Sequence, residues 1–139
     1  MNWPRIHSWL QAICTGVLVF SWVGATGLAA KEPDRQPTVQ LTVDYGDGVQ
    51  VSFTQLPWTE AMTVHDLLKS ASEHPRGIDF DIRGRGSTAL LVQIDGLKNE
   101  RGRGSNWIYW VNKKMGDRSF AVKELMPSDH VLWRFGEYE

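Results

Sequence analysis

The sequence predicts an α+β domain, because the spacing of its apolar residues changes along the chain. Two early segments alternate apolar and polar side chains, which is typical of half-buried strands. One segment then repeats apolar residues every three or four positions, as an amphipathic helix does. Alternation returns in the second half of the chain. This order predicts one mixed sheet of about five strands that curls around a single helix.

The first thirty residues differ from the rest and are predicted to be a signal peptide. Arg5 is the only charged residue among them, and residues 12–30 form an uncharged run that ends in small side chains. Gly27-Leu28-Ala29 resembles a small-x-small cleavage site. The alternative is an uncleaved membrane anchor, since the run comes near the ~20 residues that span a bilayer. Cleavage would make the protein secreted or periplasmic.

The remaining chain is predicted to form one domain. Residues 31–37 are polar and bounded by proline, which is typical of a short exposed leader. Residues 38–139 are enough for a single core that buries roughly 60–70% of the unfolded surface. Cys14, the only cysteine, lies in the predicted signal peptide. The domain is therefore expected to depend on packing and not on disulfides.

The domain is predicted to begin with a β-hairpin. Residues 38–45 (TVQLTVDY) and residues 49–55 (VQVSFTQ) both alternate apolar and polar side chains. Asp47-Gly48 between them favours the positive backbone angles of a tight hairpin turn.

A capped helix is predicted within residues 63–75. Thr63 and Asp66 form a variant of the capping box, and Pro75 is expected to end the helix. The apolar side chains at helical spacing are Val64, Leu67, Leu68 and Ala71.

Three strands are predicted after the helix, at residues 89–95, 107–112 and 130–135, with a brief additional strand at 78–82. In the second of them, Trp107, Tyr109 and Val111 share one face, whereas Ile108, Trp110 and Asn112 share the other. Since only one face can contact the helix, Trp110 is expected on the open face. A hairpin, a helix and then further strands is the element order of the β-grasp (ubiquitin-like) fold.

The segments TVHDLL, NWIYWVN and KELMPSDHVLWRF resemble the transcobalamin C-terminal-like domains, which are β-grasp modules of bacterial surface proteins. Lys113 and Ser128 stand where that family usually has glycine. In the cobalamin carriers, a large helical domain holds the ligand, and this chain has no such domain. The resemblance therefore implies a binding module, without cobalamin binding by this chain alone. The matching residues are Thr63, Trp107, Tyr109, Val111, Asn112, Leu125, Asp129 and Trp133.

No catalytic, metal or cofactor site is predicted. Ser128, Asp129 and His130 are the residue types of a catalytic triad, but sequence neighbours cannot align as nucleophile, base and orienting group. His65 and His74 lack a second ligand at metal-site spacing. We therefore expect a protein that is not an enzyme.

The pentapeptide RGRGS occurs twice, at residues 83–87 and 101–105. If the strands at 89–95 and 107–112 pair as an antiparallel hairpin, the two copies flank the face that carries Trp110. Arginine forks there would hold carboxylate, sulfate or phosphate groups. The predicted ligand-binding residues are accordingly Trp110, Arg85, Arg103 and Asn112, and the alternative is that both copies are solvated loops.

The charge distribution favours an anionic partner but not nucleic acid. After residue 30 the chain carries 14 basic and 16 acidic residues, whereas residues 83–118 carry a local excess of five positive charges. We therefore expect an exported module that binds a small ligand, an anionic glycan or an acidic protein. The alternative is an interaction subunit that docks through its open sheet face. Membrane association is expected only if the signal segment stays uncleaved.

The exported protein should begin near Ala30 or Lys31, because the small-x-small site lies there. N-terminal sequencing of the exported protein checks this. Recovery of chains with an intact Met1 from the membrane fraction would show an anchor instead.

Overall fold

The computed structural model describes residues 35–100 and 102–138. The predicted signal peptide and most of the predicted leader lie outside the described residues. Within them, no helix has the length and apolar character needed to cross a membrane. The elements are β1 (Thr38–Asp44), β2 (Gln50–Pro57), α1 (Val64–Ser72), β3 (Phe80–Arg83), the short 3-10 helix η1 (Gly86–Thr88), β4 (Leu90–Ile94), β5 (Leu97–Lys98), β6 (Asn106–Val111), β7 (Lys114–Met115) and β8 (His130–Gly136).

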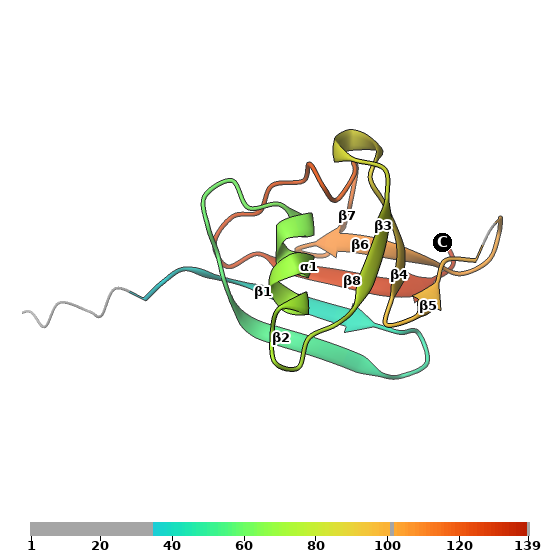
Figure 1. Ribbon diagram of the computed structural model, residues 1–139, viewed down its shortest axis with the longest axis horizontal. Helices are drawn as coiled ribbons and strands as arrows, with labels where there is room; N and C mark the ends of the chain where they lie inside the picture. Colours follow the sequence, from blue (N-terminus) through green and yellow to red (C-terminus); the bar gives the residue numbers. More distant parts are fainter. Residues whose placement is uncertain (1–34, 101, 139) are drawn as a thin grey trace, which may run out of the picture. The chain divides into compact units, whose positions relative to one another are not determined.

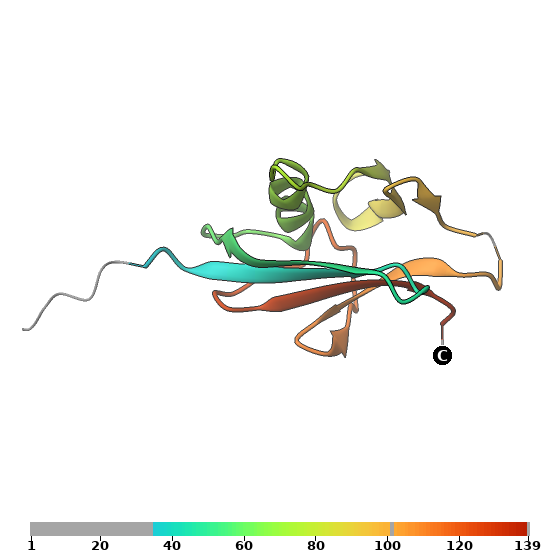
Figure 2. The same cartoon turned by 90° about the horizontal axis from the view of Figure 1, so that it is seen from below.

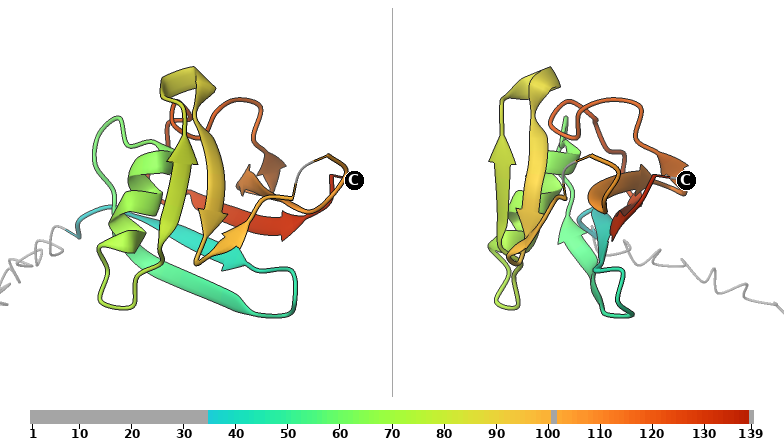
Figure 3. Two further views of the ribbon diagram at one scale, coloured as in Figure 1. Left: turned by 45° about the vertical axis from the view of Figure 1, so that its right-hand side comes forward. Right: turned by 90° about the vertical axis from the view of Figure 1, so that its right-hand side faces the viewer.

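The strands form two sheets (Figure 1). The larger is a mixed, five-stranded sheet in the order β2-β1-β8-β6-β7, in which β1 and β8 run parallel and the other pairs are antiparallel. The smaller sheet has the order β3-β4-β5. Seen edge-on, α1 and the smaller sheet lie together on one side of the five-stranded sheet (Figures 2 and 3). Among the described residues, no helix or second sheet covers the other side, which we call the open face.

The expected α+β class, with one helix and a mixed sheet of five strands, is confirmed. One strand predicted for that sheet lies in the smaller sheet instead. The strand predicted at residues 89–95 does not pair with the strand at 107–112. It pairs instead with β3, through contacts such as Phe80↔Ile94, and lies in the smaller sheet. The fifth strand of the large sheet is β7, which follows β6 directly. Both pairings join neighbours in sequence, so they close shorter loops than the predicted hairpin would.

The helix forms as its sequence predicts. The Thr63 hydroxyl accepts a hydrogen bond from the Asp66 N–H, and the Asp66 carboxylate accepts one from the Thr63 N–H, which completes the capping box. The four apolar residues predicted to share a face are all buried. The helix ends at Ser72, before Pro75.

The turns use positive backbone angles at partly unexpected positions. Between β1 and β2 the left-handed residues are Gly46 and Gly48, with φ of 77° and 95°, and not Asp47. Gly46 also lies so near the Phe135 carbonyl that a Cβ would fall 2.5 Å from its oxygen. Lys113 and Ser128 stand at positions where the transcobalamin-like domains usually have glycine. With φ of 67° and 70°, both adopt the left-handed conformation that favours glycine.

The core lies between the two layers and contains the aromatic residues predicted to face inward. Trp107 and Trp133 are 5% and 2% exposed, and the rings of Tyr109 and Trp133 lie 5.2 Å apart between centroids. The Trp107 indole donates a hydrogen bond of 2.8 Å to the Leu97 carbonyl, which ties β6 to the smaller sheet. Trp110 points away from this core and is half-buried on the open face. The face assignment within β6 is therefore confirmed.

Replacement of Trp107 or Trp133 by alanine should lower the free energy of unfolding by ~3–5 kcal/mol, because each leaves a large cavity in the core. Trp110→Ala should cost about 1 kcal/mol, since its ring is half-buried on the open face and leaves no large cavity in the core. Urea unfolding of the three variants checks the difference. Equal losses for Trp110→Ala and Trp107→Ala would contradict the assignment of faces.

Candidate functional site

The open face is polar on one half and apolar on the other. On the polar half, the Thr42 hydroxyl lies 3.2 Å from the Ser52 hydroxyl and 2.9 Å from Nε2 of His130, so three neighbouring strands are linked across β1. On the apolar half, Trp110 of β6 pairs with Leu132 of β8 and with Met115 of β7. Trp110, Leu132 and Met115 share one face, because residues that pair directly across neighbouring strands point to the same side of a sheet.

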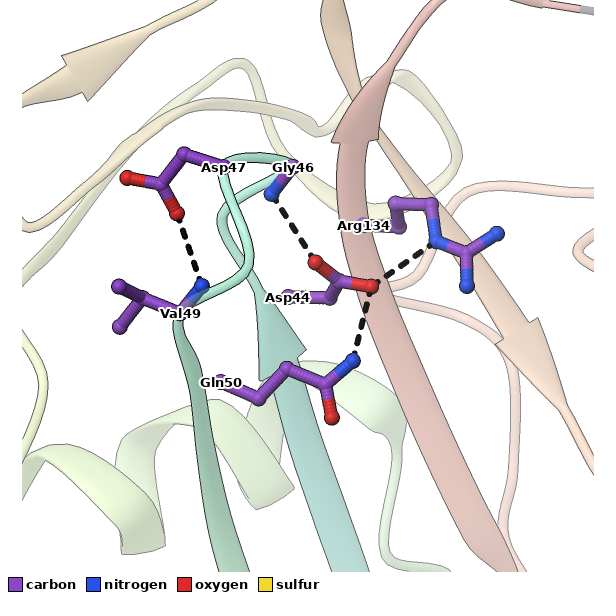
Figure 4. Close-up of polar contacts among 6 residues, drawn as sticks. All are labelled: Asp44, Gly46, Asp47, Val49, Gln50 and Arg134. Atoms are coloured by element: carbon purple, nitrogen blue, oxygen red, sulfur yellow. Dashed lines mark hydrogen bonds and ion pairs between the residues drawn. The ribbon is translucent and has the colours of Figure 1, made fainter.

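Arg134 lies at the boundary between the two halves. Its Nε donates to Oδ2 of Asp44 at 3.1 Å (Figure 4), and its guanidinium carbon lies 5.9 Å from the centre of the Trp110 ring. Asp44 also accepts hydrogen bonds from the Gly46 N–H at 2.9 Å and from the Gln50 side chain at 3.0 Å. Arg134 is thus oriented by an acid on one side and an aromatic ring on the other.

Asp44 is the buried acid that fixes this arrangement. Burial raises the pKa of its carboxyl, but the hydrogen bonds from Gly46, Arg134 and Gln50 outweigh burial, and the pKa lies below its usual value of 3.8. The carboxylate therefore stays charged at neutral pH and can hold the guanidinium in place.

A groove with a volume of about 510 Å³ opens beside Arg134. Its apolar wall contains Trp110, Met115 and Ile108, of which Ile108 is 6% exposed. Its polar wall contains Arg134 and the two residues that follow β8, Glu137 and Tyr138. The volume lies within the ~300–1,000 Å³ of pockets that hold small ligands, and an apolar wall with a few polar groups is the usual composition of such pockets.

The structure places the four predicted site residues in four different places. Trp110 lines the groove. Asn112 lies in the β6–β7 turn, where its side chain donates to Asp129 at 2.7 Å and accepts from the His130 N–H at 2.9 Å. These bonds use both ends of its amide to hold the turn.

The two predicted arginines do not flank Trp110. Arg85 directly precedes η1, which belongs to the layer on the opposite side of the large sheet (Figure 2). Arg103 lies in the loop that connects the smaller sheet to β6. Because β4 and β6 belong to different sheets, the hairpin that would have brought both RGRGS segments beside Trp110 does not exist.

Sequence reasoning missed Arg134, Glu137 and Tyr138. A signal for Arg134 was present, since alternation in residues 130–135 turns Val131 and Trp133 inward and therefore Arg134 outward. Glu137 and Tyr138 follow the end of β8, where no periodic pattern applies.

Other hollows offer weaker sites. A cavity of about 160 Å³ between the layers is walled by Tyr109, Phe120 and Trp133. The Trp133 indole N–H lacks a hydrogen-bond partner among the described residues, but the Phe120 ring stands nearly perpendicular to it, with centroids 5.5 Å apart. A depression of about 720 Å³ runs along β2, where His74 and Arg76 come near the edge strand. In neither does a guanidinium group lie over an aromatic ring, as Arg134 does over Trp110 in the groove.

Comparison with known proteins supports the fold and leaves the family open. No family model matches the chain, and no curated protein matches it. Among solved structures, the chain resembles a proposed metal-binding protein from Ruminococcus gnavus, with a TM-score of 0.58 and 14% identity over 74% of this chain and 99% of the other. Identity at this level shows a shared fold alone. The resemblance to transcobalamin-like domains stays a prediction.

Acid should weaken the fold partly through Asp44. Its pKa is lower in the folded than in the unfolded chain, so its contribution is complete above the unfolded pKa and is lost as pH falls through the folded pKa. The free energy of unfolding should therefore fall below about pH 4 less steeply for Asp44→Asn than for the wild type. Urea melts from pH 7 to pH 2.5 check this, with Asp47→Asn as the control at an exposed carboxylate of the same turn. Parallel profiles for wild type and Asp44→Asn would contradict the role of Asp44.

Proposed function

We propose that this protein is an exported, non-enzymatic binding module that holds its ligand on the open face of the five-stranded sheet. One observation supports this above the others. A half-buried Trp110 and an oriented Arg134 line the same groove on a sheet face that the rest of the described chain leaves uncovered. An aromatic ring beside a guanidinium group is a combination enriched where proteins bind partners or ligands.

Within this proposal, the fold is a β-grasp of the transcobalamin-like kind. The parallel pairing of the first and last strands, and the single helix on one side of the mixed sheet, agree with the element order of that fold. Lys113 and Ser128 support the proposed kinship, because they adopt the left-handed conformation at two positions where that family usually has glycine. The predicted signal peptide accounts for export to the periplasm or the exterior.

Binding fits the site better than catalysis or metal chemistry does. The groove contains one acid, one arginine and one phenol, and no nucleophile paired with a base. The metal-binding role proposed for the Ruminococcus gnavus protein has no evident counterpart here, since within the described residues no three His, Cys, Asp or Glu side chains converge. We therefore propose neither a metal nor a cofactor for this chain.

A second candidate function is that of an interaction subunit that docks another protein through the same face. The observation that favours it is the apolar strip formed by Trp110, Leu132 and the exposed Met115, which continues across three strands. Exposed apolar surface of this kind often marks a protein interface. Native mass spectrometry of the exported protein distinguishes the two functions, because an obligate subunit should be recovered with its partner.

Trp110→Ala should weaken ligand binding at least about tenfold while the protein stays folded, because a central aromatic residue commonly supplies ~2 kcal/mol or more of binding free energy. An array of glycans and proteins, probed with wild type and variant, measures the effect. Leu90→Ala is the matched control, since Leu90 is also an exposed apolar residue but lies in the smaller sheet. Identical binding profiles for wild type and Trp110→Ala, including no binding by either, would refute the proposed function.

A further inference from the structure

We propose, on the basis of the proposed function, that the groove binds a neutral, hydroxyl-rich pyranose ring of a glycan. Three properties of the groove lead to this ligand class: a fixed pair of hydrogen-bond donors, a nearby acceptor, and an aromatic wall without net positive charge around it. Each property belongs to a different residue.

Arg134 supplies the donors. Asp44 binds only its Nε, and among the described residues neither terminal nitrogen has a hydrogen bond or an ion pair. Figure 4 shows both terminal nitrogens directed away from Asp44. The planar guanidinium group is therefore fixed at one end and offers a pair of parallel N–H groups at the other. Such a fork can donate to two adjacent hydroxyl oxygens.

Glu137 supplies the acceptor. Its side chain is exposed and lines the same groove, and it forms no ion pair with Arg134. A carboxylate only accepts hydrogen bonds, and a guanidinium group only donates them. A sugar hydroxyl does both, so adjacent hydroxyls of one ring can satisfy both residues at once. A carboxylate or sulfate ligand could use Arg134 but would be repelled by Glu137.

The charge balance also favours a neutral ligand. Arg134 and Glu137 are the charged residues among those that line the groove, and their charges cancel. Asp44 adds a further negative charge on the other side of the guanidinium group, at 3.1 Å. An anion would therefore gain little attraction here.

Trp110 supplies the apolar surface. A pyranose ring has one face of C–H groups, which can pack on the flat and electron-rich face of an aromatic ring while the hydroxyls point sideways. Tyr138, 68% exposed at the same groove, adds a second ring with a hydroxyl group. Aromatic residues with a polar tip suit such mixed surfaces, because one part packs and the other forms hydrogen bonds.

The test uses the exported protein on an array that carries neutral glycans (glucans, mannans and xylans), uronic-acid glycans, sulfated glycans and acidic peptides. We expect a neutral glycan to bind, with an affinity that changes less than about twofold between 50 and 500 mM NaCl, because no net charge is screened. Glu137→Ala and Arg134→Lys should each weaken that binding about tenfold, since each removes hydrogen bonds to a charged group. Arg85→Ala is the matched control and should bind as wild type does, because Arg85 lies in the layer on the opposite side of the large sheet.

Each outcome decides between the proposals. Glu137→Ala alters an exposed side chain and keeps the test valid even if Arg134→Lys disturbs folding. Binding of only acidic glycans or peptides, weakened by salt and strengthened by Glu137→Ala, would overturn the neutral ligand while Trp110 dependence would still support the proposed function. A neutral glycan whose affinity is unchanged by Glu137→Ala and by Arg134→Lys would overturn the inference as well. If no ligand depends on Trp110, the proposed function itself fails.

Discussion

The structure depends on the parallel pairing of β1 with β8 at the centre of the large sheet. Its register sets Leu41 against Val131 and Val43 against Trp133, and all four are buried under α1 and the smaller sheet. The same register sets Asp44 against Arg134 on the opposite face. A shift of one residue would turn the apolar set outward and separate the ion pair, so the core and the groove depend on one choice of register.

The two faces of the sheet carry different side chains, because the helix and the smaller sheet cover only one of them. The covered face carries the large aromatic side chains that stabilise a domain without disulfides. The open face replaces them with cross-strand hydrogen bonds among Thr42, Ser52 and His130. Trp110 is the exception on that face, and Arg134 together with the groove gives a physical reason for its presence.

Local patterns in the sequence predicted the helix, its cap, most strands and the inward face of β6, because each depends on residues close together in the chain. Strand partners were harder to predict. Alternation in residues 89–95 shows which side is buried but does not show whether the partner is β3 or β6, and β3 lies closer along the chain. The pair of Asp44 and Arg134, 90 residues apart, follows only once the parallel register is known. Alternation in the last strand indicated that Arg134 points outward, but it did not indicate which residues lie beside it.

The position of the groove has a practical consequence. Two of its residues, Glu137 and Tyr138, directly follow the last strand, so the C-terminal end of the domain emerges at the groove, whereas β1 begins at the far end of the sheet (Figure 1). A purification tag, fluorophore or surface linker attached at this end would lie beside the groove and would compete with any ligand bound there. Attachment before β1 leaves the open face accessible, and immobilisation chemistry for this protein should be chosen accordingly.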